Sequence, residues 1–221
     1  MGHFTWDWHF VWSVLPQLLE GLRLTVLATL CGSVISFVMG MIWTLGRMAS
    51  IRMVTPAIEF FVQFIRGTPL LIQLFFLYYV FPTWGITLPA FTTGVIGLGL
   101  FYSSYTAEIY RAGIENLPAG QWEAALTLGL PLRRVWLGVV LPQSIRAILP
   151  MLGNQVIGMF KESALLSTIT VMELLGQATT IGQMDFRYVE PLTLVGALYF
   201  GISYTAARAV RRLEVSHALR T

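Results

Sequence analysis

The residues of this chain best placed to do chemistry are a charged pair, Lys161 and Glu162, followed by Ser163. The pair ends an apolar run at 147–160, and Lys161 is the only lysine in the chain. Adjacent residues on a helix point about 100° apart, so one charge can face a zwitterionic ligand while the other faces a neighbouring helix. Inside a bilayer, charges normally face protein or a water-filled cavity. The competing interpretation places both charges at the outer membrane surface.

A second group of polar residues lies around another apolar run, 67–107. Arg66, Thr68 and Gln73 stand at its start, where a Gly-Thr-Pro sequence permits close helix approach and leaves a backbone carbonyl unpaired. One interpretation is that Arg66, Thr68 and Gln73 line an inner gate. The other is that Arg66 extends to the membrane surface while Thr68 and Gln73 form hydrogen bonds between helices. Glu108 and Arg111 lie one helical turn apart at its end and are expected to pair.

No set of residues indicates catalysis. The sequence contains no P-loop, so the chain cannot cradle ATP itself. His3, His9 and His217 are scattered near the ends without metal-ligand spacing, and the single Cys31 has no base near it in sequence. We therefore expect no catalytic residue, no metal site and no cofactor bound by this chain.

Composition indicates a membrane protein. Of the 221 residues 56% are hydrophobic and 11% are charged, with a mean hydropathy of +0.70, whereas soluble domains carry about 25% charged residues. The net charge is +3, but the cations sit in separate patches rather than on one continuous basic face. This pattern predicts membrane topology and argues against nucleic-acid binding.

Charge-free stretches predict five transmembrane helices in an all-α fold. Residues 24–46 form one span and residues 191–207 form the last. The run 67–107 is too long for one span and is broken by the Pro- and Gly-containing turn at 82–89, so it gives two. Residues 147–160 cover only about 21 Å of a roughly 30 Å core, so this fourth helix either ends early or carries its charged pair at membrane depth.

Arginine clusters predict the orientation. They follow the first span, lie between the third and fourth, and end the chain: Arg47, Arg52 and Arg66; Arg111, Arg133, Arg134 and Arg146; Arg208, Arg211, Arg212 and Arg220. The turn at 82–90 has no charge, and the segment 173–190 has three acidic residues and one arginine. The positive-inside rule then places the N-terminus outside and the C-terminus in the cytoplasm.

The cytoplasmic segment 114–144 is predicted to form a helix–turn–helix. Residues 121–128 suit a helix that Gly129 and Pro131 stop, and residues 132–140 suit a second one before Pro142 re-enters the membrane. The small residues Ala124, Ala125 and Gly129 permit close approach by another backbone. The alternative is an amphipathic connector that lies on the lipid surface.

Several motifs in this sequence resemble those of binding-protein-dependent ABC importer permeases. Glu123-Ala124-Ala125, Gly129 and Val139-x-Leu141-Pro142 resemble the coupling motif of that family, with Val139 in place of the usual isoleucine. Residues 66–74, 107–114 and 120–125 resemble signatures of the polar amino acid uptake subgroup. Residues 161–167 resemble its Lys-Asp-Thr-Ser-Leu segment, with Glu162, Ser163 and Ala164 substituted.

The resemblance implies the type I ABC importer permease fold, with five transmembrane helices and a cytoplasmic coupling helix–turn–helix. The implied layout is an N-terminal extracytoplasmic or interfacial segment at 1–19, a transmembrane domain at 20–212 with its coupling loop at about 117–142, and a tail at 213–221. The residues implied in ATPase coupling are Glu123, Ala124, Ala125, Gly129, Leu141 and Pro142. The candidates for the substrate pathway or gate are Arg66, Thr68, Gln73, Glu108, Lys161, Glu162 and Ser163.

The resemblance also implies partners. These are a second permease chain, identical or a sister, two ABC ATPase subunits that hold ATP and Mg, and an extracytoplasmic substrate-binding protein. The location implied is the bacterial cytoplasmic membrane, and the substrate a polar amino acid or a similar zwitterion. Residues 188–193 also resemble permeases for ectoine-type compatible solutes.

A different class of function is a membrane scaffold or integral-membrane enzyme whose cytoplasmic loop binds another protein. An enzyme would need convergent acid, base or metal groups, which the sequence does not assemble. A scaffold would not need a charged pair at depth. Copurification of a nucleotide-binding subunit with this chain, and its release when the loop is removed, would separate these classes from an importer.

Overall fold

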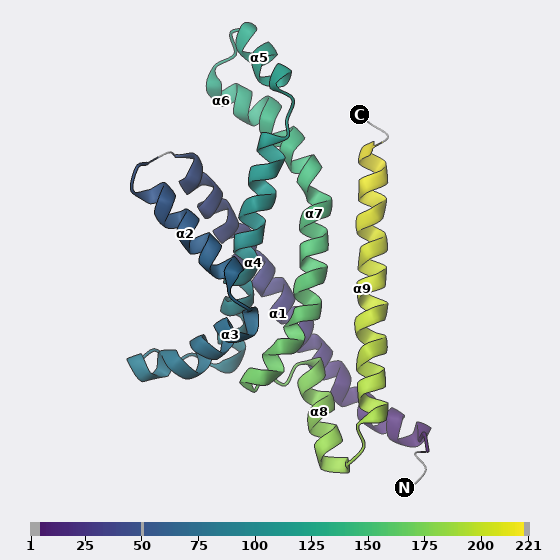
Figure 1. Cartoon of the computed structure of the whole chain (residues 1–221). Helices are drawn as coiled ribbons and strands as arrows, with labels where there is room; N and C mark the ends of the chain where they lie inside the picture. Colours follow the sequence, from purple (N-terminus) through teal and green to yellow (C-terminus); the bar gives the residue numbers. More distant parts are fainter. Residues whose placement is uncertain (1–4, 50, 219–221) are drawn as a thin grey trace.

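The computed structural model describes residues 5–49 and 51–218, with side chains up to residue 214. Every regular element in these ranges is helical, which confirms the predicted all-α class. Figure 1 shows the helices as a loose bundle with a small knob at one end. His3 and Arg220 lie outside the described residues, as does the side chain of His217.

The first helix, α1 (Trp8–Met48), is much longer than its predicted charge-free span at 24–46. Asp7 caps it by accepting hydrogen bonds from the backbone N–H groups of His9 and Phe10, and the Phe10 bond is the main cause of the lowered pKa of that carboxyl. Charges do not end a helix, so α1 continues through residue 20 without a break. The extracytoplasmic location of residues 1–19 stays a prediction.

The predicted second span is broken. Helix α2 (Val54–Gly67) is followed by α3 (Leu70–Phe75), η1 (Phe76–Val80) and η2 (Phe81–Trp84), and the two parts are bent by 104°. The physical reason is Pro69, which has no N–H for the helical ladder and forces Thr68 into an extended conformation. The continuous helix expected from residue 67 onward thus begins only after a sharp corner (Figure 1).

Helix α4 (Ala90–Glu115) starts after Pro89, which confirms the predicted turn before it, and packs along α1. The two helices approach closely because glycines on each of them leave room for side chains of the other. A β-carbon added at Gly99 would lie 2.6 Å from Ile35, and one at Gly40 would lie 2.6 Å from Thr106. This close packing is typical of small residues in membrane helices.

The second half of the chain leads out to the knob and back. Helices α5 (Ala119–Thr127) and α6 (Leu132–Arg134) and the π-helix η3 (Val135–Val140) form the knob, and α7 (Leu141–Glu162) runs back along α4. The remaining elements are η4 (Ser163–Ile169), α8 (Leu174–Asp185) and α9 (Val189–Ala218). The predicted fourth span at 147–160 is therefore part of a longer helix.

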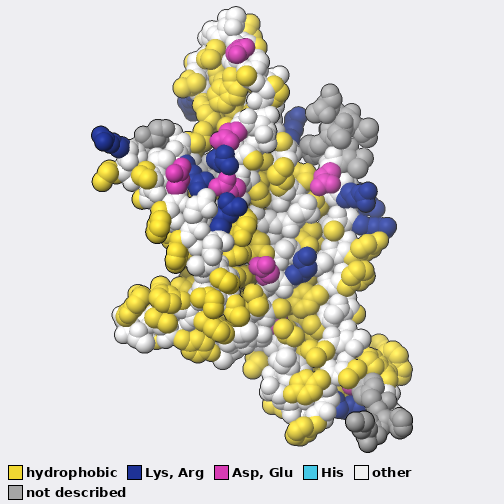
Figure 2. Space-filling model, in the orientation of Figure 1, with side chains coloured by type: hydrophobic (Ala, Val, Ile, Leu, Met, Phe, Trp, Pro, Cys, Tyr) yellow, Lys and Arg dark blue, Asp and Glu magenta, His cyan; other side chains and the backbone are white. Residues whose placement is uncertain are grey.

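The five predicted spans correspond in order to α1, the bent pair α2–α3, α4, α7 and α9. Trp8–Met48 and Leu132–Ile169 are long and apolar enough to cross a membrane, and the bent pair adds a third stretch. Helices α4 and α9 have 26 and 30 residues, more than the roughly 20 that a span needs, but they are less apolar and do not meet the same standard. Figure 2 shows broad apolar surface, especially over α3, with most charges nearer the knob end, as expected for a protein that contacts lipid.

Candidate functional site

The knob has a shape fixed mainly by its backbone. We call residues 118–142 the elbow. Helix α5 ends in a Schellman motif, in which the N–H of Leu130 donates to the carbonyl of Ala125 at 3.2 Å and that of Gly129 donates to Leu126 at 2.9 Å. Gly129 has φ +68°, a conformation that costs other residues about 1–2 kcal/mol. The predicted stop at Gly129 is thus confirmed.

A small apolar core holds the elbow together. Ala125, Val135 and Val140 are buried, and the rings of Trp122 and Trp136 meet edge to face at 5.0 Å. The core joins α5 to η3, so the two arms of the elbow move as one body.

The outer face of the elbow is exposed and largely apolar. Glu123 and Ala124 are exposed there, beside Leu126 and Leu128, the latter 77% exposed. Ala125 points into the core instead, so only Ala124 and Gly129 of the three small residues can admit another backbone. Glu123 lies beyond the first turn of α5 and does not cap its start.

Leu141 and Pro142 lie where the elbow continues into α7. Pro142 has no N–H to donate four residues back, and the preceding residues adopt a π-helix in which the N–H of Leu141 donates to the carbonyl of Trp136. The helical path is not interrupted: residues Leu132–Ile169 form one stretch of 38 residues. The elbow is therefore continuous with α7.

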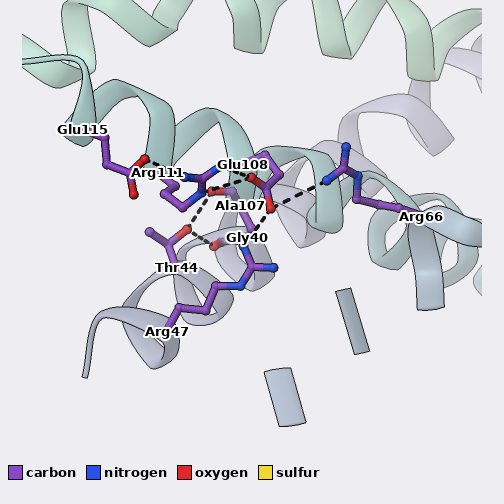
Figure 3. Close-up of polar contacts among 8 residues, drawn as sticks. All are labelled: Gly40, Thr44, Arg47, Arg66, Ala107, Glu108, Arg111 and Glu115. Carbon is purple, nitrogen blue, oxygen red and sulfur yellow. Dashed lines mark hydrogen bonds and ion pairs between the residues drawn. The ribbon is translucent and has the colours of Figure 1, made fainter. Parts of the chain in front are cut away.

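Glu108 is the centre of a charged cluster that joins three helices (Figure 3). Its carboxylate lies 2.7 Å from Arg47 of α1, 3.7 Å from Arg66 of α2 and 2.8 Å from Arg111 of α4. Arg111 also lies 2.5 Å from Glu115. The predicted Glu108–Arg111 pair is confirmed, but it is part of a larger network.

Arg66 does not simply extend into solvent, because its guanidinium lies over the Tyr105 ring at 5.2 Å in addition to its contact with Glu108. The cluster lines a polar cavity of about 680 Å³ between α1, α2 and α4. Thr44 strengthens the same junction by donating to the carbonyls of Gly40 and Ala107. The three helices are thus fastened together at this level.

Thr68 and Gln73 close the corner between α2 and α3. The amide of Gln73 donates to the Ile65 carbonyl at 2.8 Å and to the Thr68 hydroxyl at 2.7 Å, while Thr68 donates to the Phe64 carbonyl at 3.0 Å. Carbonyls at a helix end have no partner within the helix. These two side chains supply it, which supports a structural role for both.

Lys161 and Glu162 form the last turn of α7, and both are exposed. The preceding Met159 packs against Leu98 of α4, and its sulfur lies 3.6 Å from the Ser33 hydroxyl of α1. Ser33 and Leu98 both lie well inside charge-free stretches. Ser163 is buried and donates to the Phe160 carbonyl at 2.7 Å, a helix-end contact.

A groove connects Glu162 with the Glu108 cluster. It has a volume of about 520 Å³ and is lined by residues of α4 and α7, namely Phe101, Tyr102, Tyr105, Glu108, Ile109, Met151, Gln155 and Glu162. Met151 and Glu162 are eleven residues apart on α7, so the groove extends about 16 Å along the helix. Carboxylates at both ends and aromatic rings between them suit a ligand that carries an ammonium group.

Gln155 is a lining residue that sequence reasoning missed. Its amide donates to the Ser36 hydroxyl, the Tyr102 carbonyl and the Thr106 hydroxyl, while its buried Oε1 has no hydrogen-bond partner among the described residues. The available signal was a polar amide within the apolar run at 147–160.

Glu173 is one of the three acidic residues of the segment 173–190, and no structural role was predicted for it. Its side chain is fully buried and caps α8 by accepting from the N–H groups of Leu175 and Gly176. It also accepts from Thr25 of α1 and Tyr199 of α9. Through these contacts Glu173 fastens three helices.

Comparison with known proteins places the elbow and the bundle in one family. The model for binding-protein-dependent transport system inner membrane components matches residues 32–214. The chain belongs to this family. The matched residues include the elbow, the Glu108 cluster, and Lys161 and Glu162. They leave out residues 8–31 of α1.

Individual relatives agree along nearly the whole length. The chain is 42% identical to the "Probable amino-acid ABC transporter permease protein y4tG" of Sinorhizobium fredii, covering 96% of this chain and 94% of that one. It is 35% identical to the L-cystine transport system permease protein TcyB of Bacillus subtilis, covering 91% and 88%. The crystal structure of an amino acid ABC transporter with histidines matches with a TM-score of 0.92 and 37% identity, covering 96% and 100%.

These matches confirm the predicted permease fold of this inner-membrane component. They do not favour the scaffold or membrane-enzyme alternative. The predicted assignments of single residues to coupling, gate or pathway rest on the geometry described above.

Proposed function

We propose that this inner-membrane component is the permease subunit of an ATP-driven importer for a polar amino acid or a similar zwitterion, working by alternating access. The observation that carries the proposal is the single helical stretch Leu132–Ile169, which begins in the elbow and contains Glu162. A push on the elbow is thereby coupled to the groove without any chemistry in this chain.

The elbow is the proposed docking site for an ABC ATPase. Glu123, Ala124 and Gly129 present its outer face, Ala125 holds its core, and Leu141 and Pro142 join it to α7. Exposed leucines around them provide an apolar surface that a protein groove can cover. ATP and Mg are held by two such ATPase subunits, and this chain binds no cofactor or metal.

The remaining partners are a second permease chain, identical or a sister, and an extracytoplasmic substrate-binding protein. Figure 1 supports the orientation, because the elbow and the end of α9 lie at one end of the bundle and the start of α1 at the other. With the elbow in the cytoplasm, the N-terminal side lies outside the bacterial cytoplasmic membrane. This agrees with the positive-inside rule.

The groove between α4 and α7 is the proposed substrate pathway. Glu162 lies near one end of it and Glu108, held by Arg47, Arg66 and Arg111, near the other. The Glu108 cluster acts as the inner gate, because opening the pathway there requires α1, α2 and α4 to separate. Lys161 stands beside the groove, where a carboxylate of a zwitterion can meet it. Relatives whose names refer to amino acids and L-cystine support this substrate class.

The proposal is tested with Gly129→Ala in the reconstituted complex with its ATPase. A methyl group strains the left-handed turn by about 1–2 kcal/mol and changes the shape of the docking face. We expect ATP hydrolysis to continue while substrate uptake falls several-fold. Uptake that stays coupled to hydrolysis would count against the docking role.

Gly85→Ala is the matched control. Gly85 also has a positive φ, +82°, and neither glycine has an atom within 4 Å of an added β-carbon. The two substitutions therefore impose similar backbone strain, but Gly85 ends η2, far along the chain from the elbow. Uptake should remain coupled in this variant.

A further inference from the structure

Helix α9 stands at the edge of the bundle, with one side packed and the other open (Figure 1). On the packed side, Val195 joins the apolar cluster formed with α1 and α8, and Val210 lies beside Gly153 of α7. On the open side, Phe200 is 69% exposed and Tyr204 is 48% exposed. The open side is therefore the part of α9 that another molecule is free to cover.

Three arginines end the open side of α9. Arg208, Arg211 and Arg212 are exposed, and Arg208 lies three and four residues before the other two, so it neighbours both on the helix surface. No ion pair joins any of them to an acid within residues 5–49 and 51–214. Glu214, the nearest acid in the sequence, is also exposed. Figure 2 shows basic side chains gathered over this part of α9, so the cluster carries uncompensated positive charge.

Aromatic rings connect this cluster to the membrane part of the helix. The guanidinium of Arg208 lies 5.0 Å from the centre of the Tyr204 ring, and the rings of Tyr204 and Phe200 stack at 5.6 Å with an angle of 18° between their planes. Two other arginines of the described chain lie over a ring, but Arg66 and Arg187 also meet a carboxylate. Arg208 is held in place by Tyr204 and keeps its charge available, which distinguishes it from other exposed arginines.

A strip of small residues runs beside the two rings. Ala197, Gly201 and Thr205 follow one another at intervals of four residues and share one side of the helix. All three are exposed, and a β-carbon added at Gly201 would meet no atom within 4 Å. Gly201 precedes Arg208 by seven residues, about two turns, so the strip leads to the arginine. A low, uncharged strip flanked by rings has the shape that a hydrocarbon chain can follow.

The length of α9 places the arginines at a membrane surface. At the other end of the helix, Glu190 pairs with Arg187. Arg208 follows Glu190 by 18 residues, all those between being uncharged, which corresponds to about 27 Å of helix. The hydrocarbon core of a bilayer is roughly 30 Å thick. With the Glu190 pair at one surface, the three arginines lie at the level of the phospholipid headgroups of the other.

We propose that the open side of α9 is a binding site for one anionic phospholipid. The phosphate-bearing headgroup lies on Arg208, Arg211 and Arg212, and one acyl chain follows the strip of small residues. A net negative headgroup complements the three cations, because arginine binds phosphate oxygens through paired N–H groups. A zwitterionic headgroup would bring a further cation to the same cluster. The site goes beyond the proposed function, because it requires only that α9 lies in a bilayer.

The number and kind of lipids that stay bound to the full-length chain test this site. The chain is purified in detergent micelles that contain equal amounts of dioleoyl phosphatidylglycerol and dioleoyl phosphatidylcholine, and native mass spectrometry counts the retained lipids. We expect one phosphatidylglycerol per chain to be retained in preference to phosphatidylcholine. Equal retention of the two lipids would overturn the proposal.

Arg208→Gln tests the headgroup contact. We expect the affinity for phosphatidylglycerol to fall about fivefold, the factor that corresponds to about 1 kcal/mol for one arginine near an anionic surface. Arg52→Gln is the matched control, because Arg52 is also exposed and forms no ion pair within the described residues, but it lies between α1 and α2. An equal fall in both variants would show a general effect of charge and would contradict a site on α9.

Gly201→Leu tests the acyl chain contact while all three arginines remain. Leucine fills the strip and is a better helix former than glycine, so α9 is kept. We expect retention of phosphatidylglycerol to fall several-fold. Gly196→Leu is the control, since Gly196 is exposed and also has no atom within 4 Å of an added β-carbon, but it lies about 140° around the helix from Gly201. Retention should be unchanged there, and equal losses in the two variants would count against the strip.

Two further results would assign the open side of α9 to a different occupant. Displacement of the lipid by excess inorganic phosphate, compared with sodium chloride at the same ionic strength, would indicate a site for a free anion. A change in the number of chains per particle in Gly201→Leu, with unchanged lipid retention, would indicate that a protein covers the strip. Either result overturns the lipid site, whereas retention that resists phosphate and falls in Gly201→Leu supports it.

Discussion

Two charged sites at the two ends of the groove behave in opposite ways. Glu108 is surrounded by Arg47, Arg66 and Arg111, which come from three different helices. Lys161 and Glu162 adjoin each other in sequence but form no ion pair with any described residue. In the sequence, Glu108 lies three residues before Arg111, whereas Lys161 directly precedes Glu162. The tertiary structure completes one and leaves the other open, which indicates stabilisation at the first and interaction with another molecule at the second.

The largest effect is expected from Glu108→Gln. This change leaves Arg47, whose side chain is 11% exposed, without its carboxylate. Removing one partner of a buried pair is strongly destabilising, and with partial solvent access we expect a loss of about 2–3 kcal/mol. Thermal unfolding of the purified protein in detergent measures it.

Glu115→Gln is the matched control for that change. Glu115 contacts only the exposed end of Arg111, and its side chain is 58% exposed. The free energy of unfolding lost in Glu115→Gln should therefore be below about 0.5 kcal/mol. Equal losses of unfolding free energy in the two variants would contradict the prediction, because Glu108 would then matter no more to the cluster than the exposed Glu115.

The open site should respond in transport rather than in stability. Glu162→Gln removes a charge that no other described side chain neutralises, so we expect the thermal midpoint to change little. Substrate uptake should fall about tenfold, the factor that corresponds to about 1.4 kcal/mol of lost interaction. Initial uptake rates in proteoliposomes measure this, with Lys161→Arg, which keeps its charge, as the control. A large drop in the thermal midpoint of Glu162→Gln would contradict this prediction, because Glu162 would then stabilise the fold as Glu108 does.

Glu173 provides a third case for the comparison, because all the hydrogen-bond donors to its carboxylate are uncharged. The variant is Glu173→Gln. The amide keeps the size of the side chain but presents N–H groups to donors on α1, α8 and α9. We expect a loss of about 1 kcal/mol in unfolding free energy, smaller than for Glu108→Gln. Hydrogen exchange of the α8 amides should increase, and unchanged protection there would contradict the capping role.

The smallest effect is expected from Arg66→Lys. Lysine keeps the charge that lies 3.7 Å from Glu108 but loses the planar group over Tyr105. The loss should be about 0.5 kcal/mol, visible as a small shift in the thermal midpoint. A loss as large as that of Glu108→Gln would show that Arg66, rather than Arg47, is the main partner of that carboxylate.

Much of the fold could be predicted from the sequence. The charge-free stretches identified the membrane helices, and the glycine and proline around residues 129–131 identified the elbow, because these signals are local. Pro69 was recognised as a residue that leaves a backbone carbonyl unpaired, but the corner it makes was not predicted. A proline removes a donor in any context, whereas the 104° bend depends on what α3 packs against.

The candidate site was predicted less completely. Glu123, Gly129 and Glu108 were found by motif and spacing, and the roles of Thr68, Gln73 and Ser163 became clear only from their hydrogen bonds to helix ends. The burial of Glu173 and its capping role were not predicted, because they depend on contacts with α1 and α9. Gln155 was missed because its partners lie on α1 and α4, at least 49 residues away in sequence.

The sequence by itself determined that this protein lies in lipid, that its fold is helical and where its elbow lies. Hydropathy, proline and glycine act over a few residues, so these features are local. Only the tertiary structure decided which charges are satisfied. An ion pair between helices depends on distances that the tertiary structure sets. Glu108 meets Arg47 and Arg66 from two other helices, whereas no basic side chain among the described residues forms an ion pair with Glu162.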